Sequence, residues 1–111
     1  VVAYQNEIKT KILGVSQYII DEKTEVSLEV VEQMAKSVLE KFDANFAIAT
    51  TGYAGPAGGT NKNPIGTVFI AIASVVGVVV SRFVFLGDRQ SVVNQASESA
   101  LSLLYTEIKK Q

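Results

Sequence analysis

The 111-residue sequence contains no cysteine, no histidine and no tryptophan. Without cysteine the chain can form no disulfide and offers no thiolate nucleophile. Without histidine as well, it lacks a Ser-His-Asp triad and the usual zinc ligands. Any catalysis must use other groups, and we expect no metal and no cofactor. The lack of cysteine agrees with a reducing compartment, so we expect a cytoplasmic protein.

The sequence also lacks an excess of either charge and a long uninterrupted apolar run. Ten basic residues balance eleven acidic ones, and the lysines are dispersed, so the charge gives no case for nucleic-acid binding. The most apolar stretch, residues 65–80, is broken by glycine, serine and threonine, and it is shorter than the roughly 18 to 20 residues that a membrane span needs. It predicts a buried β-hairpin with its turn at Val75-Val76-Gly77, so we expect no membrane partner.

Length and composition favour one small globular domain, with 48% hydrophobic and 19% charged residues. Apolar residues at helical spacing predict a helix from a Ser27 cap to about Phe42, and a final helix over about 89–109. Strands are expected near 46–51, over 67–74 and over 78–85. The predicted inner residues of the two helices are Val30, Val31, Met34, Val38 and Leu39, and Val92, Val93, Ala96, Ala100, Leu103 and Leu104.

The predicted order of elements indicates an α/β fold. The chain opens on an apolar strand at Val1, followed by short helical segments over residues 6–13 and 16–20. The crossover through a helix from that strand to Phe46 favours parallel pairing, whereas the short hairpin turn requires antiparallel pairing. We therefore predict a three-layer α/β/α sandwich with a mixed, mainly parallel sheet. Residues 1–111 are interpreted as the C-terminal part of a single domain, with the N-terminal part absent.

The segment from Thr50 to Thr67 holds five of the eight glycines and both prolines. Glycine allows close approach of backbone amides to a ligand, and successive amides can form an anion-binding nest. The segment is neither a Walker A sequence nor the dinucleotide fingerprint. A tight turn without a ligand remains the alternative interpretation. The candidate ligand groups are the backbones of Gly52, Gly55, Gly58 and Gly59 and the hydroxyls of Thr50, Thr51, Thr60 and Thr67.

Three further side chains are candidates for a site. Arg89 falls in the first turn of the last helix, where the helix dipole disfavours a cation unless an anion is bound. Its alternative role is an ion pair with Asp88 or another surface carboxylate. Tyr4 ends the first predicted strand and Lys9 lies early in the next helix. Taken alone this pair is a weak signal, because lysines on short helices are usually solvated.

These segments together resemble the CinA C-terminal domain family, which includes the competence/damage-inducible proteins and the bacterial nicotinamide mononucleotide deamidases. The resemblance runs from Tyr4 into the last helix, and the glycine-proline loop followed by Pro-x-Gly-Thr is its most specific part. The matching segments, in order, are Tyr4-Gln5-Asn6-Glu7-Ile8-Lys9, Leu13-Gly14-Val15, Val26-Ser27, Met34-Ala35, residues 51–59, Pro64-Ile65-Gly66-Thr67-Val68 and Gly87-Asp88-Arg89.

The resemblance implies hydrolysis of the carboxamide of nicotinamide mononucleotide to the carboxylate, with release of ammonia, in pyridine-nucleotide salvage. The family uses a serine nucleophile without histidine. The resemblance assigns its lysine partner to Lys9 and a positioning role to Tyr4. It also implies that Thr51 lines the site and that Arg89 binds substrate, while the glycine-rich loop, with Thr67 at its end, helps to hold the phosphate.

The family's nucleophilic serine lies in a Gly-Ser-Ser-like segment before the tyrosine, and this sequence contains no such segment. None of Ser16, Ser27, Ser37 and Ser74 lies in a matching context. We therefore expect the isolated chain to be inactive, with the nucleophile upstream of it. A non-catalytic nucleotide-binding or assembly module is the alternative, and exposed apolar surface would favour a homo-oligomer.

Overall fold

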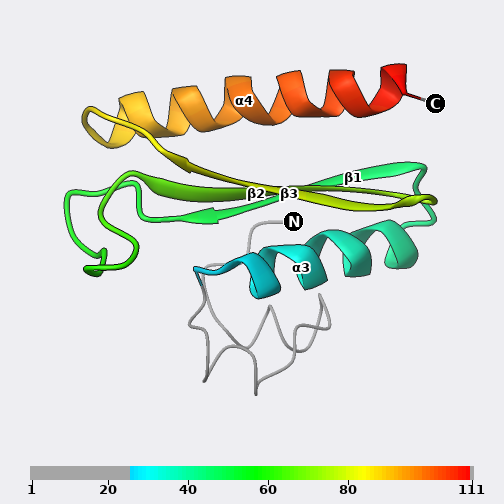
Figure 1. The fold of residues 1–111 in the computed structure, drawn as a ribbon, viewed down its shortest axis with the longest axis horizontal. Coiled ribbons are helices and arrows are strands. Elements are labelled where there is room, and N and C mark those ends of the chain that lie inside the picture. The colour runs from blue at the N-terminus through cyan, green and yellow to red at the C-terminus, as the bar shows by residue number, and fades with distance from the viewer. Residues whose placement is uncertain (1–25, 111) are drawn as a thin grey trace.

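The computed structural model describes residues 26–110. The predicted strand at Val1 and the helical segments that follow it, with Tyr4 and Lys9, lie outside the described residues. The described elements follow the predicted order (Figure 1). They are helix α3 (Leu28–Lys41), strands β1 (Phe46–Gly52), β2 (Thr67–Ser74) and β3 (Gly77–Val84), and helix α4 (Arg89–Lys109).

The three strands form one sheet in the order β1-β2-β3, and both pairings are antiparallel. The predicted hairpin is confirmed, but β3 begins one residue before the prediction because Gly77 already pairs with Ser74. The sequence predicted a mainly parallel sheet, whereas the sheet formed by residues 26–110 is antiparallel throughout. The expected parallel pairing depended on the strand at Val1, which lies outside the described residues.

Helix α3 covers one face of the sheet. The Ser27 hydroxyl caps it by accepting a hydrogen bond from the Val30 amide at 3.2 Å. The helical spacing of Val30, Val31 and Met34 places them in the core, as predicted. Ala35, which was not predicted, is also buried, whereas the predicted Val38 and Leu39 are partly buried. The sheet residues that they meet are mostly alanine, so the helix can lie close to the strands. These sheet residues are Ala47, Ala49, Phe69, Ala71 and Ala73.

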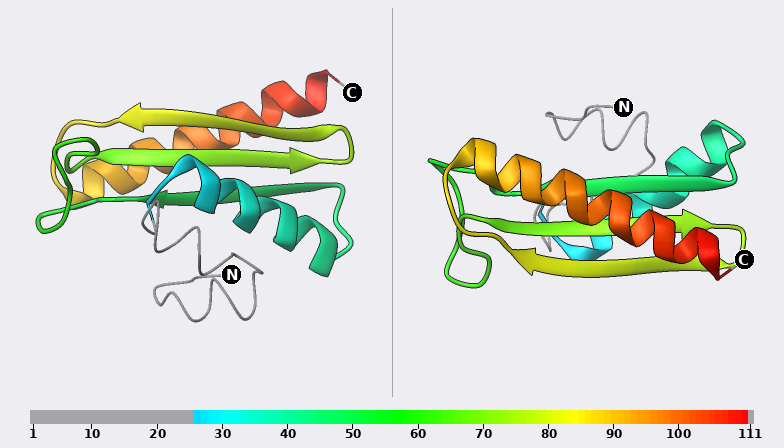
Figure 2. Two further views of the ribbon diagram at one scale, coloured as in Figure 1. Left: turned by 60° about the horizontal axis from the view of Figure 1, so that its bottom comes forward. Right: turned by 90° about the horizontal axis from the view of Figure 1, so that it is seen from above.

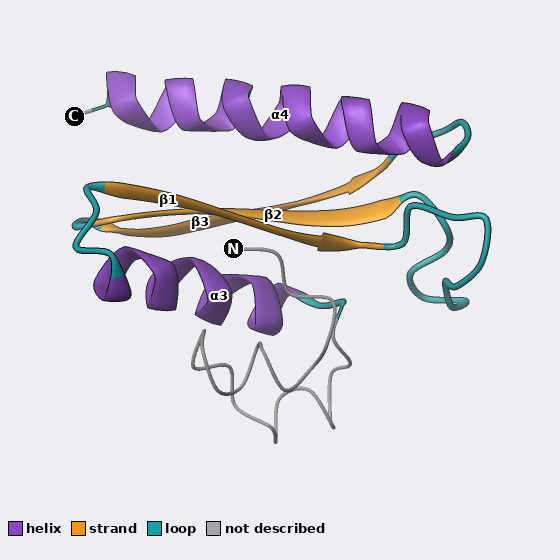
Figure 3. Cartoon of the chain, turned by 180° about the vertical axis from the view of Figure 1, so that it is seen from behind, coloured by secondary structure: helices purple, strands orange, loops and turns teal. Residues whose placement is uncertain are grey.

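Helix α4 covers the opposite face and runs obliquely across the strands (Figures 2 and 3). Asp88 caps it, with its carboxylate oxygen accepting from the Ser91 amide at 2.9 Å. The predicted inner residues Val92 and Ala100 are buried against Val68, Ile70 and Ile72. The prediction was wrong for Val93, which is 42% exposed because its side chain lies on the flank of the helix toward β1. None of the described helices is both long and apolar enough to cross a membrane.

Candidate functional site

The glycine-rich segment forms a closed loop between β1 and β2. Where the two strands end, the Tyr53 amide donates to the Thr67 carbonyl at 2.9 Å and the Gly66 amide donates to the Tyr53 carbonyl at 2.6 Å. At the tip, the Thr60 amide donates to the Asn63 carbonyl at 2.8 Å, and the Thr60 hydroxyl accepts from the Asn63 amide at 2.9 Å. The loop thus has a defined path that begins and ends at adjacent strands.

Glycine is required at two points of this path. Gly66 has φ of 99°, and a Cβ there would collide with the Phe85 carbonyl oxygen. Gly59 has φ of 86°, and a Cβ there would lie 2.8 Å from the Ile65 amide nitrogen. L-residues rarely adopt this region of φ. Both the backbone conformation and the lack of space for a Cβ atom therefore favour glycine at these two positions.

Loop amides remain available for a ligand. Within residues 26–110, the amides of Gly55, Gly58 and Gly59 have no hydrogen-bond partner. Gly58 is exposed and Gly59 is partly exposed, whereas Gly55 is buried. The adjacent amides of Gly58 and Gly59 are therefore candidate donors to a bound anion.

Two arginines from different elements hold the loop. The Arg89 guanidinium, at the start of α4, donates to the Gly55 carbonyl at 3.1 Å. The Arg82 guanidinium, from β3, donates to the Lys62 carbonyl at 3.1 Å and to the Asn63 side-chain oxygen at 3.4 Å. Asp88 caps α4 instead of pairing with its neighbour, so the guanidinium of Arg89 lies beside the loop and the helix N-terminus.

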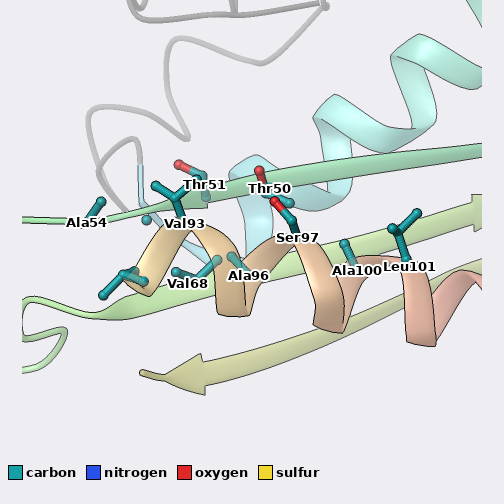
Figure 4. A pocket seen from close by; sticks show the side chains of 11 residues that line it. Thr50, Thr51, Ala54, Val68, Val93, Ala96, Ser97, Ala100 and Leu101 are labelled. Atoms are coloured by element: carbon teal, nitrogen blue, oxygen red, sulfur yellow. The ribbon is translucent and has the colours of Figure 1, made fainter. Parts of the chain in front are cut away.

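A groove of about 440 Å³ lies between α4 and the end of β1 (Figure 4). Small and apolar side chains form most of its walls, and the hydroxyl-bearing residues Thr50, Thr51 and Ser97 lie along it. It sits on the flank of α4 just beyond Arg89. The groove is lined by Thr50, Thr51, Gly52, Ala54, Val68, Val92, Val93, Ala96, Ser97, Ala100 and Leu101.

Thr67 occupies a different environment from the other candidate residues. It is fully buried at the start of β2, and its hydroxyl has no hydrogen-bond partner among the described residues. Gly52 ends β1 directly beside it, where a Cβ would press against the Thr67 carbonyl oxygen. The structure therefore brings Thr51, Gly52, Gly55 and Arg89 to one end of the sheet, and places the Thr67 hydroxyl inside the packed core there.

In the part of the chain that the structure describes, no group of three or more acidic side chains is placed to bind a metal ion. The available chemistry consists of a guanidinium, free amides, hydroxyls and an apolar groove. This arrangement suits an anionic small molecule with a second part that can lie in the groove.

Comparison with known proteins agrees with the motifs. Residues 1–108 match the CinA C-terminal domain. The chain belongs to the CinA C-terminal domain family. A CinA-like protein of Flavobacterium psychrophilum is 46% identical over 110 residues, covering 99% of the chain and 26% of the relative. A CinA-like protein of Fervidobacterium nodosum is 42% identical over 104 residues, covering 94% and 26%. The chain thus spans about a quarter of the length of these curated CinA relatives.

Solved CinA structures share the fold. A competence-damaged protein (CinA) superfamily protein from Enterobacter cloacae superposes with a TM-score of 0.91 at 37% identity, covering 96% of this chain and 63% of that one. A competence/damage inducible protein from Agrobacterium tumefaciens gives 0.91 at 33% identity, covering 95% and 65%. The described antiparallel sheet with a helix on each face is therefore a CinA-type α/β fold.

Sequence reasoning missed two parts of this CinA-family site. No role was predicted for Arg82, because the residues that it contacts lie 19 and 20 positions away in the chain. The groove was also missed, although the small residues Ala96, Ser97 and Ala100 on one side of α4 were a usable signal. Small side chains on a helix that crosses a sheet edge leave space between the two elements.

Proposed function

We propose that the CinA-family domain to which this chain contributes is a nicotinamide-nucleotide amidohydrolase. The reaction converts nicotinamide mononucleotide and water into nicotinate mononucleotide and ammonia. The observation that carries the proposal is the hydrogen bond of Arg89 to the Gly55 carbonyl, because it brings a fixed cation to the glycine-rich loop. The bacterial family membership of the chain supports the choice of substrate.

The phosphate of the nucleotide is proposed to bind at the Arg89 guanidinium, with the amides of Gly58 and Gly59 and the N-terminus of α4 as further candidate donors. Gly55 takes one of the five N–H donors of the guanidinium, and no other described residue takes another. A guanidinium with free donors favours phosphate, which it can bind through two parallel hydrogen bonds.

The pyridinium ring of the substrate and its carboxamide are proposed to lie in the groove beside β1. Its volume is within the range of roughly 300 to 1,000 Å³ that is usual for small-molecule sites. Its apolar walls suit an aromatic ring, and the nearby Thr51 and Ser97 can exchange hydrogen bonds with the carboxamide or the ribose.

The remaining roles belong to residues outside the described part of the chain. In this proposal Lys9 is the base, Tyr4 positions the reacting groups, and a serine outside this sequence attacks the carboxamide carbon. Loss of ammonia leaves an acyl-enzyme, and water then releases the carboxylate. We propose for the complete domain a cytoplasmic location and a three-layer architecture in which further strands extend the sheet in parallel.

Binding is tested by calorimetric titration of the 111-residue chain with nicotinamide mononucleotide. Arg89→Ala is expected to weaken binding about 10- to 100-fold, since it removes roughly 1.5 to 3 kcal/mol of charged hydrogen bonding. Arg82→Ala is the matched control, because it also removes a guanidinium that donates to a loop carbonyl at 3.1 Å. We expect it to change the affinity less than twofold. Equal affinities of the Arg89→Ala variant and the unaltered chain would contradict the proposal.

Turnover is tested by measuring ammonia release from nicotinamide mononucleotide by the longer protein that carries the complete domain. We expect release, and its loss in the Lys9→Ala variant. Release that is unchanged by this substitution would exclude the proposed base. Binding that depends on Arg89, without any release by the complete domain, would establish the alternative of a non-catalytic nucleotide-binding module.

A further inference from the structure

The outer edge of β3 has no pairing strand among residues 26–110 (Figure 2). The Phe85 amide donates to the Gly66 carbonyl at 2.9 Å. This bond shows which residues of β3 form hydrogen-bonded pairs with β2. Because hydrogen-bonded pairs alternate along an antiparallel ladder, the odd-numbered residues of β3 bond to β2. The amides and carbonyls of the even-numbered residues, Val78, Val80, Arg82 and Val84, point to the free edge.

This edge lacks the features that usually prevent strands from pairing with other chains. Natural proteins protect free edges with proline, lysine, inward-pointing charges or a bulge. β3 has the sequence Gly-Val-Val-Val-Ser-Arg-Phe-Val, with one charge in eight residues. That charge, on Arg82, is drawn to the loop through its contacts with Lys62 and Asn63. Among residues 26–110, nothing covers the outer backbone of β3, so it is open to an added strand.

We propose that the edge of β3 binds the same edge of a second copy of this chain, forming a continuous sheet that joins the three described strands of each copy. An antiparallel pairing with its two-fold axis at Ser81 sets Val78 opposite Val84 and Val80 opposite Arg82. All four outward-facing residues of each copy are then in hydrogen-bonded pairs. With two bonds in each of four pairs, the junction would hold about eight backbone hydrogen bonds. A foreign strand would need to match this pattern by chance, whereas a second copy matches it by symmetry.

Charge and helix placement agree with a two-fold pairing. Arg82 lies opposite Val80 of the other copy, so the two arginines are diagonal neighbours and not directly opposed. The axis runs perpendicular to the sheet, so both α4 helices lie on one face and run antiparallel. The flank of α4 toward β3 is fixed by Gln95, whose amide donates to the Leu86 carbonyl at 2.8 Å. Most residues of that flank are polar and uncharged, namely Ser91, Gln95, Ser99, Ser102 and Thr106, with Glu98 and Lys109 at its outer margin.

The pairing is tested with single cysteines in the 111-residue chain, which has none of its own. The two Ser81 residues would form a non-hydrogen-bonded pair with Cα atoms about 4.5 Å apart, within the range that a disulfide spans. Mild oxidation of Ser81→Cys should give a covalent dimer within minutes. Ser97→Cys, on the other flank of α4, should give at least tenfold less dimer. Equal cross-linking of both variants would overturn the proposal, as would a chain that sediments as a monomer at all concentrations.

A second pair of variants distinguishes the two edges of the sheet. Proline removes a backbone donor and is tolerated on an edge strand where the N–H points outward. Val80→Pro removes an outward donor from β3, and Ile48→Pro does the same on β1 at a residue of similar partial burial. Sedimentation should show a monomer for Val80→Pro and a dimer for Ile48→Pro. The reverse result would overturn the assignment to β3.

Discussion

The two faces of the sheet are packed differently. Among the described residues, ten buried apolar residues form the cluster on the α3 face, whereas five form the cluster on the α4 face. α3 buries four of its 14 residues, and the longer α4 buries only two of its 21. The groove and the contact of Arg89 with the loop both belong to the α4 side. The α3 face therefore holds more fully buried residues, and we expect it to contribute more to stability, while the α4 face leaves room for a ligand.

The largest expected effect comes from replacing one valine by alanine on each of the two helices and comparing the losses of stability. Val31 is fully buried under α3, and Val93 is 42% exposed on α4. Val31→Ala should lower the free energy of unfolding by about 2 to 3 kcal/mol, through lost burial and a residual cavity. Val93→Ala should change it by less than about 0.5 kcal/mol. Urea denaturation followed by circular dichroism measures both.

The comparison fails if both valine variants lose the same stability, since α4 would then contribute as much as α3. The difference between the two faces becomes clearer if Val93→Ala leaves the stability unchanged but alters the affinity for nicotinamide mononucleotide. That result would assign the exposed flank of α4 to binding and not to folding.

An intermediate effect is expected at the two helix caps. Ser27 is buried and its hydroxyl accepts from Val30, whereas Asp88 is exposed and accepts from Ser91. Ser27→Ala should cost about 1.5 kcal/mol, because water cannot replace the hydroxyl at a buried helix end. Asp88→Ala should cost about 0.5 to 1 kcal/mol, because water can reach the exposed amide. If urea denaturation shows that Asp88→Ala loses more stability than Ser27→Ala, the cap of α4 contributes more than the cap of α3, contrary to this expectation.

The smallest expected effect has the opposite sign. The Thr67 hydroxyl is buried without a hydrogen-bond partner among residues 26–110, which is unfavourable. Thr67→Val keeps the shape and removes the unpaired group, so it should raise the free energy of unfolding by about 1 kcal/mol. Thermal denaturation measures this, and calorimetry shows whether nucleotide affinity falls at the same time. A loss of stability would mean that the hydroxyl has a partner in solution.

Local sequence signals predicted most of the fold of residues 26–110. The bounds of α4 and β2 were predicted correctly, because Asp88 and the turn at Val75-Val76 interrupt clear periodic patterns. The Ser27 cap likewise predicted the start of α3. The mainly parallel sheet is not confirmed: the described strands all pair antiparallel, and the expected parallel pairing involves the strand at Val1, outside the described residues.

The candidate site was less predictable than the fold. The glycine-rich loop and Arg89 were singled out from sequence, and their hydrogen bond spans 34 residues of chain. No local sequence pattern indicated that Arg82 donates hydrogen bonds to the same loop. The burial of the Thr67 hydroxyl was also not foreseen, since threonine at the start of a strand is often solvated.

The sequence by itself determined the helices, the hairpin, the caps and the glycine positions, because each of these depends on residues within a few places of one another. It also carried the motifs of the CinA C-terminal domain family. Only the tertiary structure decided that α4 crosses the sheet obliquely, which exposes Val93 and opens the groove beside β1. Only the tertiary structure brought two arginines to one loop. Packing angles and distant contacts depend on the shapes of whole faces, and these are set when the elements meet.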